Sequence, residues 1–445
     1  MLSYEESRKL TDKIIHLARP AQVEILLVNH SLALTRYADS IITQNVSENN
    51  LLELHIKIIK NGKFSKITLN QIDDTSLKQA IKGSNYFVSA PGTELGLVPK
   101  QKYVTVNAYH EQTASVSPAY RTSAIKESVI EARNHLVNIS GIFSNTSSVI
   151  TLANSKGLFA YYPSTMAEFT CTALTNNSSG KAEKITRDIS QIKSSQITKI
   201  AVDKALKSKN PINLNAGTYT VILEPVAAVE LLVFMAFAGF GALSYQEGHS
   251  FMSGKIGKRI MGENISIIED AYHPNILGMP FDFEGMPRKK VILIDKGIAR
   301  NVVYDRLTAK KGKCSSTGHG FPQPNEHGPF PTYLTLAPGN SSLKEMIAST
   351  EKGILITELH YTNLIDPMKM IITGMTRNGT FLIEKGNITQ GIKNMRFTEN
   401  IFNVLSNVEL ISSKTELNRG FFGTSEFVMP ALKIRNFNFS SSSGF

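Results

Sequence analysis

Short apolar stretches and segments of helical periodicity alternate along the first half of the chain. Runs that are apolar throughout, or that alternate apolar with polar residues, are typical of strands, because successive side chains along a strand point to opposite faces. The predicted strands are residues 23–29, 33–38, 51–59, 64–68, 147–153 and 159–175. Asn61-Gly62 is typical of a hairpin turn and predicts an antiparallel connection between residues 51–59 and 64–68.

Helices are predicted between and around these strands. Asp73 is a helix-capping residue and predicts a helix that runs to about Lys82. The other predicted helices of this half are residues 3–17, 115–136 and 200–208. Proline lacks a backbone N–H and disfavours a helical residue before it, so the last helix ends by Asn210-Pro211. We therefore predict an N-terminal domain of residues 1–210 and a C-terminal domain of residues 211–445.

The second half contains more strands and fewer helices. Pro225 fits the first turn of a helix over residues 226–237, and Ser342 with Glu345 forms a capping-box pattern at the start of a second, short helix. The predicted strands are residues 219–223, 291–294, 333–336, 354–359, 370–373, 380–383 and 432–439. Many short strands with turn signals between them indicate a strongly curved, barrel-like sheet. The predicted fold class is therefore α+β, with an antiparallel sheet and helices in the N-terminal domain and a barrel-like sheet in the C-terminal domain.

Length and composition are consistent with two globular domains. At 445 residues the chain exceeds the roughly 250–300 residues at which a single core usually divides. The longest apolar run, residues 231–243, is shorter than the roughly 20 residues that a membrane-spanning helix needs. The polar N-terminus lacks the apolar core of a signal peptide, and Cys171 and Cys314 make no disulfide framework. We expect a soluble cytoplasmic protein with no membrane partner.

The formal net charge of +11 raises the possibility of a nucleic-acid partner. The basic residues are scattered, however, and short groups such as Lys310-Lys-Gly-Lys313 lack interleaved aromatic residues for base stacking. This pattern favours a solvated lysine-rich surface over a nucleic-acid interface.

Several motifs in a fixed order resemble those of the TldD/TldE (PmbA) family of metallopeptidase-related proteins. The segments are Ala33-Leu-Thr-Arg-Tyr-Ala38, Gln44-Asn-Val-Ser-Glu48, Ala153-Asn-Ser-Lys-Gly157, Arg187-Asp188, Leu223-Glu-Pro225, Gly248-His-Ser-Phe-Met-Ser-Gly-Lys-Ile-Gly-Lys-Arg259, Phe281-Asp-Phe-Glu-Gly285, Ser316-Thr-Gly318 and Gly374-Met-Thr-Arg-Asn-Gly-Thr-Phe-Leu-Ile-Glu384. The greatest similarity is to the TldE/PmbA-like branch. The resemblance implies a two-domain fold with a curved C-terminal sheet.

The same resemblance implies that the family's zinc site is missing here. In the TldD branch a helix carries His-Glu-x-x-x-His, and a cysteine near the C-terminus supplies the third zinc ligand. The corresponding positions in this chain are Val233, Phe234 and Ala238, and residues 415–422 contain no cysteine. We therefore predict no catalytic residue and no metal ligand of the family type in this chain.

Other histidines allow an atypical metal site. His319 and His327 flank a proline-rich segment that also holds Glu326, and we weigh a metal site there against a polar surface loop. His360 and Glu358 lie two residues apart on a predicted strand and thus on one face, which is a second possible metal pair or an ordinary solvated face.

The segment Ser253-Gly-Lys-Ile-Gly-Lys-Arg259 lacks the order of a phosphate-binding loop. Its glycines fit tight backbone packing. Basic residues in and beside it, His249, Lys255 and Arg259, are candidates for contact with a peptide or with a partner protein.

Three functional hypotheses follow. The first is a TldE/PmbA-like noncatalytic subunit that has no cofactor of its own and pairs with a zinc-bearing TldD-like subunit to degrade or mature unfolded peptides, with a homodimer as a further possibility. The second is an autonomous metallopeptidase using His319, His327 and His360. The third is a regulator of a nucleic-acid enzyme, suggested by the charge and by the family's association with DNA gyrase modulation.

Overall fold

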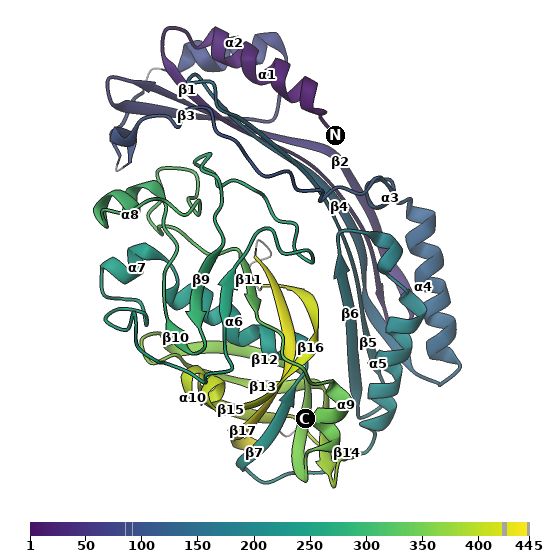
Figure 1. Ribbon diagram of the computed structural model, residues 1–445. Coiled ribbons are helices and arrows are strands. Elements are labelled where there is room, and N and C mark those ends of the chain that lie inside the picture. The colour runs from purple at the N-terminus through teal and green to yellow at the C-terminus, as the bar shows by residue number, and fades with distance from the viewer. Residues whose placement is uncertain (85, 91, 421–424, 443–445) are drawn as a thin grey trace.

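A six-stranded antiparallel sheet forms the N-terminal half of the computed structural model, which describes residues 1–84, 86–90, 92–420 and 425–442. The strand order is β3-β2-β1-β4-β5-β6. The strands are β1 (Gln22–Ala38), β2 (Ile41–Lys60), β3 (Lys63–Leu69), β4 (Asn138–Asn154), β5 (Phe159–Leu174) and β6 (Ser179–Thr186). The sheet curves around the C-terminal half of the molecule (Figure 1).

Helices cover the outer face of this sheet, on the side away from the C-terminal half (Figure 1). They are α1 (Tyr4–Leu17), α2 (Asp74–Gly83), α3 (Glu111–Ala114), α4 (Pro118–Arg133) and α5 (Ser194–Lys207), with the short 3₁₀ turn η2 (Ile189–Gln191). A second 3₁₀ turn, η1 (Thr93–Leu95), contacts the C-terminal half, where Arg306 donates to the Leu95 carbonyl. Ser3, Asp73 and Ser117 accept backbone hydrogen bonds from the first turns of α1, α2 and α4, which satisfies N–H groups that have no partner within the helix. One apolar cluster lies beneath α1. A second lies beneath α4 and α5.

The strands of this sheet are longer than their apolar pattern predicts. Residues 23–29 and 33–38 belong to one strand, β1, because β1 pairs with β2 on one side and β4 on the other through the intervening polar residues. β2 and β4 likewise begin about ten residues before the predicted segments, and β6 is a strand that the pattern does not predict. Backbone pairing on the sheet therefore decides these boundaries.

An eleven-stranded mixed sheet forms the C-terminal half of the described chain. The strands are β7 (Gly217–Leu223), β8 (Ile267–Glu269), β9 (Val291–Asp295), β10 (Ile298–Ala299), β11 (Tyr333–Leu336), β12 (Lys352–Asp366), β13 (Ile371–Glu384), β14 (Asn387–Gly391), β15 (Met395–Asn400), β16 (Val408–Arg419) and β17 (Glu426–Ser442). The helices are α6 (Pro225–Gly239), α7 (Ala242–Gln246), α8 (Arg306–Lys311), α9 (Leu343–Ala348) and α10 (Ile401–Ser406).

Part of this sheet closes on itself. β17 pairs with β15, β15 with β13, β13 with β12, β12 with β7, and β7 pairs again with β17. The strongly curved C-terminal sheet predicted from the short strands is therefore confirmed, and so is the α+β class. The sequence predicts two separate strands at residues 370–373 and 380–383. In the structure both belong to the single strand β13, which begins at Ile371, because β12 pairs with β13 along most of the length of β13.

Polar contacts join the two halves of the chain. Arg187, which follows β6, forms two hydrogen bonds with the carboxylate of Glu426 on β17, at 2.7 and 2.8 Å. The Tyr162 hydroxyl on β5 donates to the Leu277 carbonyl at 2.6 Å. Among the residues that the structure describes, no helix is long and apolar enough to span a bilayer.

Candidate functional site

The helix α6 carries Val233, Phe234 and Ala238, the positions that the family resemblance aligns with the His-Glu-x-x-x-His motif. Most of its side chains are buried in the largest apolar cluster of the C-terminal half. Val226, Glu230, Phe234 and Phe237 are not buried, and their spacing of four, four and three residues places them on one face of the helix. Of the three predicted positions, only Phe234 lies on this face, whereas Val233 and Ala238 are each 6% exposed.

Glu230 is the one ionisable residue on this face of α6. Removal from water and the nearby charge of Glu358 raise the pKa of Glu230 to about 7. A carboxyl group with this pKa exchanges a proton close to neutral pH. The sequence pattern does not single out Glu230, because its pKa depends on burial in the folded chain and on Glu358, which lies 128 positions later in the chain.

Strands β6 and β12 place charged side chains beside Glu230. The Glu358 carboxylate on β12 accepts hydrogen bonds from the Lys181 ammonium at 2.7 Å and from the Asn378 amide at 2.6 Å. Lys181 also lies 3.1 Å from Glu183. Burial by itself would lower the pKa of Lys181, but Glu183 and Glu358 raise it above its ordinary value. Glu358 is therefore engaged by a cation that comes from the other half of the chain.

His360 shares one strand face with Glu358, as its spacing predicts, but it has its own partner. Its Nε2 atom is hydrogen-bonded to the Arg377 guanidinium on β13. Burial and the charge of Arg377 lower the pKa of His360. Arg377 and Lys181 both place positive charge where a metal cation would have to bind, so this pair is poorly suited to metal binding.

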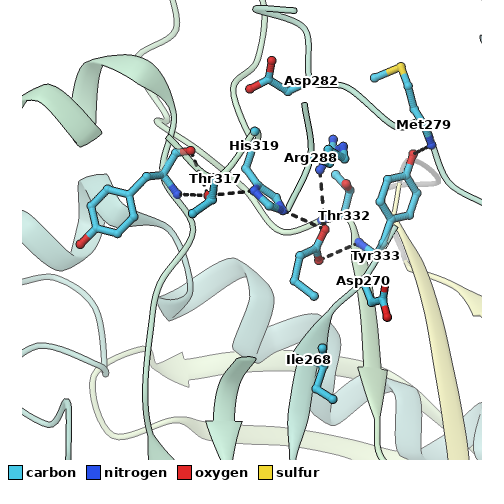
Figure 2. A network of polar contacts seen from close by, with 12 residues as sticks. Ile268, Asp270, Met279, Asp282, Arg288, Thr317, His319, Thr332 and Tyr333 are labelled. Atoms are coloured by element: carbon cyan, nitrogen blue, oxygen red, sulfur yellow. Dashed lines mark hydrogen bonds and ion pairs between the residues drawn. The ribbon is translucent and has the colours of Figure 1, made fainter. Parts of the chain in front are cut away.

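His319 belongs to a buried polar network (Figure 2). Its Nε2 atom lies 3.1 Å from Glu269 Oε1, and its Nδ1 atom lies 2.9 Å from Thr317 Oγ1. Arg288 Nη1 lies 3.6 Å from the same Glu269 oxygen, and the Tyr333 backbone N–H donates to the other at 2.9 Å. Both ring nitrogens of His319 are thus occupied within the protein.

The interpretation of residues 319–327 as a surface loop is wrong for His319, which is 1% exposed. It is buried because its segment lies against the end of β8, where Glu269 provides a charged hydrogen-bond partner. His327 and Glu326, by contrast, are exposed. The structure therefore separates the two histidines by environment and does not bring them together in one site.

The three basic candidates for contact lie after α7. The side chain of His249 is 79% exposed. The Lys255 ammonium lies 4.9 Å from the centre of the Phe402 ring, and the Arg259 guanidinium donates to the Lys296 carbonyl at 2.8 Å. His249 and Arg259 are exposed, whereas Lys255 is partly buried.

The residues present do not fit a zinc ion of the family type. A hydrolytic zinc site needs about three His, Cys, Asp or Glu ligands and an open position for water. Within residues 1–84, 86–90, 92–420 and 425–442, no three such side chains are grouped to hold a metal ion. The segment without cysteine, residues 415–422, lies partly in β16, and its residues Phe421 and Phe422 lie outside the described residues.

Sequence comparisons place the chain among known proteins. The metalloprotease TldD homologue of Haemophilus influenzae is 27% identical over 226 residues, which cover 50% of this chain and 46% of that protein. The match therefore spans about half the length of this relative. The metalloprotease PmbA homologue of Buchnera aphidicola subsp. Acyrthosiphon pisum is 25% identical over 418 residues, with 89% of each chain covered.

A solved structure shows the same fold. TldE from Thermococcus kodakarensis superposes with a TM-score of 0.85 at 19% identity, over 97% of this chain and 99% of that chain. Family models described as the PmbA/TldA metallopeptidase central domain and C-terminal domain match residues 111–209 and 216–441. The matched segments flank the predicted boundary at Asn210-Pro211, which stays a prediction. Because the C-terminal family model alone covers half of the chain, this chain belongs to the PmbA/TldD (TldD/TldE) family.

Proposed function

We propose that this chain is a TldE/PmbA-like subunit that binds no zinc of its own and acts with a zinc-bearing TldD-like subunit. The observation that carries the proposal is the face of α6 formed by Val226, Glu230, Phe234 and Phe237. It holds a single ionisable side chain, whereas a hydrolytic zinc site requires about three ligands. The complex would degrade or mature unfolded peptides in the cytoplasm.

The near full-length match to a PmbA homologue supports this branch of the family. The sheet of the N-terminal half curves around the C-terminal half (Figure 1), and both an ion pair and apolar clusters join the two halves. An extended peptide is bound through main-chain hydrogen bonds that do not depend on its sequence, which suits unfolded substrates.

Zinc content and peptide cleavage test the proposal on one purified sample. We expect near-zero zinc by elemental analysis, no cleavage of an unfolded peptide by the chain alone, and chelator-sensitive cleavage after mixing with a TldD-like subunit. The TldD-like subunit alone is the control for its own basal activity. Stoichiometric zinc with chelator-sensitive cleavage by the chain alone would instead support an autonomous metallopeptidase using His319, His327 and His360.

A second experiment tests the contact surface around His249, Lys255 and Arg259. His249→Glu reverses the charge that this exposed position can carry, and we expect it to weaken association with the TldD-like subunit about fivefold. His327→Glu makes the same change on another exposed loop and should leave association unchanged. Affinity is measured by titrating the two subunits, and equal affinities for both variants would place the partner elsewhere.

The regulator hypothesis stays a prediction with less support. The basic residues that suggested it are scattered along the sequence, and several, including Lys181, Arg187 and Lys204, form ion pairs with carboxylates within the chain. An effect of the purified chain on gyrase activity that persists at moderate salt would support it.

A further inference from the structure

A cavity of about 390 Å³ lies between the two halves of the chain, at the start of α6. Its walls come from β6 and α5 of the N-terminal half and from α6, α9, β12, β13, β14 and β16 of the C-terminal half. Small-molecule sites in proteins are typically about 300–1,000 Å³ and mostly apolar, with a few polar groups that orient the ligand. This cavity falls in that range.

The floor of the cavity is apolar and holds one unpaired hydroxyl. Leu355 and Phe381, both almost fully buried, form the floor together with Ile347 on α9. Thr357 also lines the cavity, is 2% exposed, and its hydroxyl has no hydrogen-bond partner among the described residues. A buried hydroxyl without a partner is unfavourable, so a ligand or a water that bonds to it gains that interaction.

The rim of the cavity carries charges of both signs. Lys204 is paired with Glu224 at 2.5 Å, and Lys181 with Glu183 at 3.1 Å. Asp203 and Lys207 are exposed on one face of α5, four residues apart, so their side chains are neighbours. In total the lining contains three lysines and four carboxylates. This balance disfavours a polyanion such as a nucleotide, and the charged rim disfavours a long hydrocarbon chain.

We infer that this cavity binds an apolar amino acid, either free or at the end of a short peptide. The apolar side chain would lie on Leu355 and Phe381, and a polar group next to it would bond to the Thr357 hydroxyl. At the rim, an ammonium group of the ligand would face Asp203, and a carboxylate would face Lys207. This inference stands apart from the proposed partnership, because binding is measured on the chain alone.

Calorimetric titration with four probes tests the ligand class. L-phenylalanine, Phe-Ala-Ala and Ala-Ala-Phe each carry an apolar side chain next to a charged group, whereas N-acetylphenylalanine amide has no charge. We expect at least one charged probe to bind about tenfold or more tighter than the amide. The probe that binds with the highest affinity identifies the natural ligand as a free amino acid, a peptide N-terminus or a peptide C-terminus. Equal binding of the amide, or no binding of any probe, overturns the inference.

Two variants test the location. Ile347→Trp fills the cavity from the partly exposed helix α9, and we expect it to abolish binding. Thr357→Val removes the hydroxyl at nearly constant volume and should weaken binding about fivefold. Met368→Trp, at a 45% exposed position outside the cavity lining, is the control and should bind normally. Since the chain has no tryptophan, the introduced residue also reports folding by its fluorescence. Unchanged affinity in a folded Ile347→Trp protein places the ligand elsewhere.

Discussion

Replacing Arg187 with methionine will lower the free energy of unfolding by about 3–5 kcal/mol, because it leaves the buried carboxylate of Glu426 without a counter-charge. Arg187 and Glu426 are 8% and 9% exposed and share two hydrogen bonds. The Arg187 Nε atom also donates to the Ile276 carbonyl at 2.9 Å. One side chain thus holds two distant segments of the C-terminal half against the end of β6.

Urea denaturation of three variants distinguishes this ion pair from simple packing. The double variant Arg187→Met/Glu426→Met removes both charges and should be more stable than Arg187→Met alone, because no buried charge is left unpaired. Arg8→Met breaks the exposed ion pair between Arg8 and Asp12 and should change stability by less than about 1 kcal/mol. If Arg187→Met behaves like Arg8→Met, the pair does not hold the two halves together.

Replacing Glu230 with glutamine will stabilise the protein by about 2–3 kcal/mol at pH 8 and will have almost no effect near pH 4.5. Burial and the charge of Glu358 raise the pKa of Glu230 from 4.5 to about 7. A carboxyl group whose pKa is raised by folding destabilises the folded state only when it must ionise. The penalty is therefore absent below the unfolded value, grows as the pH rises from 4.5, and is complete above about pH 7.

The thermal midpoints of the wild type and of Glu230→Gln, measured between pH 4.5 and pH 8, check this sign. The difference between the two thermal midpoints should increase with rising pH and then level off. Glu326→Gln, on an exposed loop, makes the same chemical change and should show no such trend. A difference that is constant across the pH range would mean that glutamine acts through packing or hydrogen bonding and that the ionisation of Glu230 does not control stability.

The raised pKa of Glu230 also matters because this residue lies close to two features described above. Glu230 lies one turn from Val226, which lines the cavity, and one turn from Phe234, which stands where the sequence comparison places a zinc-site residue. A ligand that places a positive charge near this face of α6 would lower the pKa of Glu230 and bind more tightly as the pH rises through 7.

The sequence by itself determined the family, the α+β class and much of the local structure. Caps at Asp73 and Ser342 and the turn at Asn61-Gly62 depend on residues a few positions apart, and the structure has each of them. Pro225 begins α6, as its fixed φ angle favours. These features are predictable because the physical causes are local.

Only the tertiary structure decided the lengths of the long strands and the environment of the ionisable groups. His30 and Ser31 stay in β1 because strands on both sides provide hydrogen bonds, although their polar side chains do not predict a strand. His319 is buried at the end of β8, where its ring nitrogens contact Glu269 and Thr317. Glu230 has a raised pKa, and Thr357 lines a cavity, because β6, α5 and β12 converge at α6. Burial and pairing across more than a hundred residues are properties of the folded chain, which a local pattern does not contain.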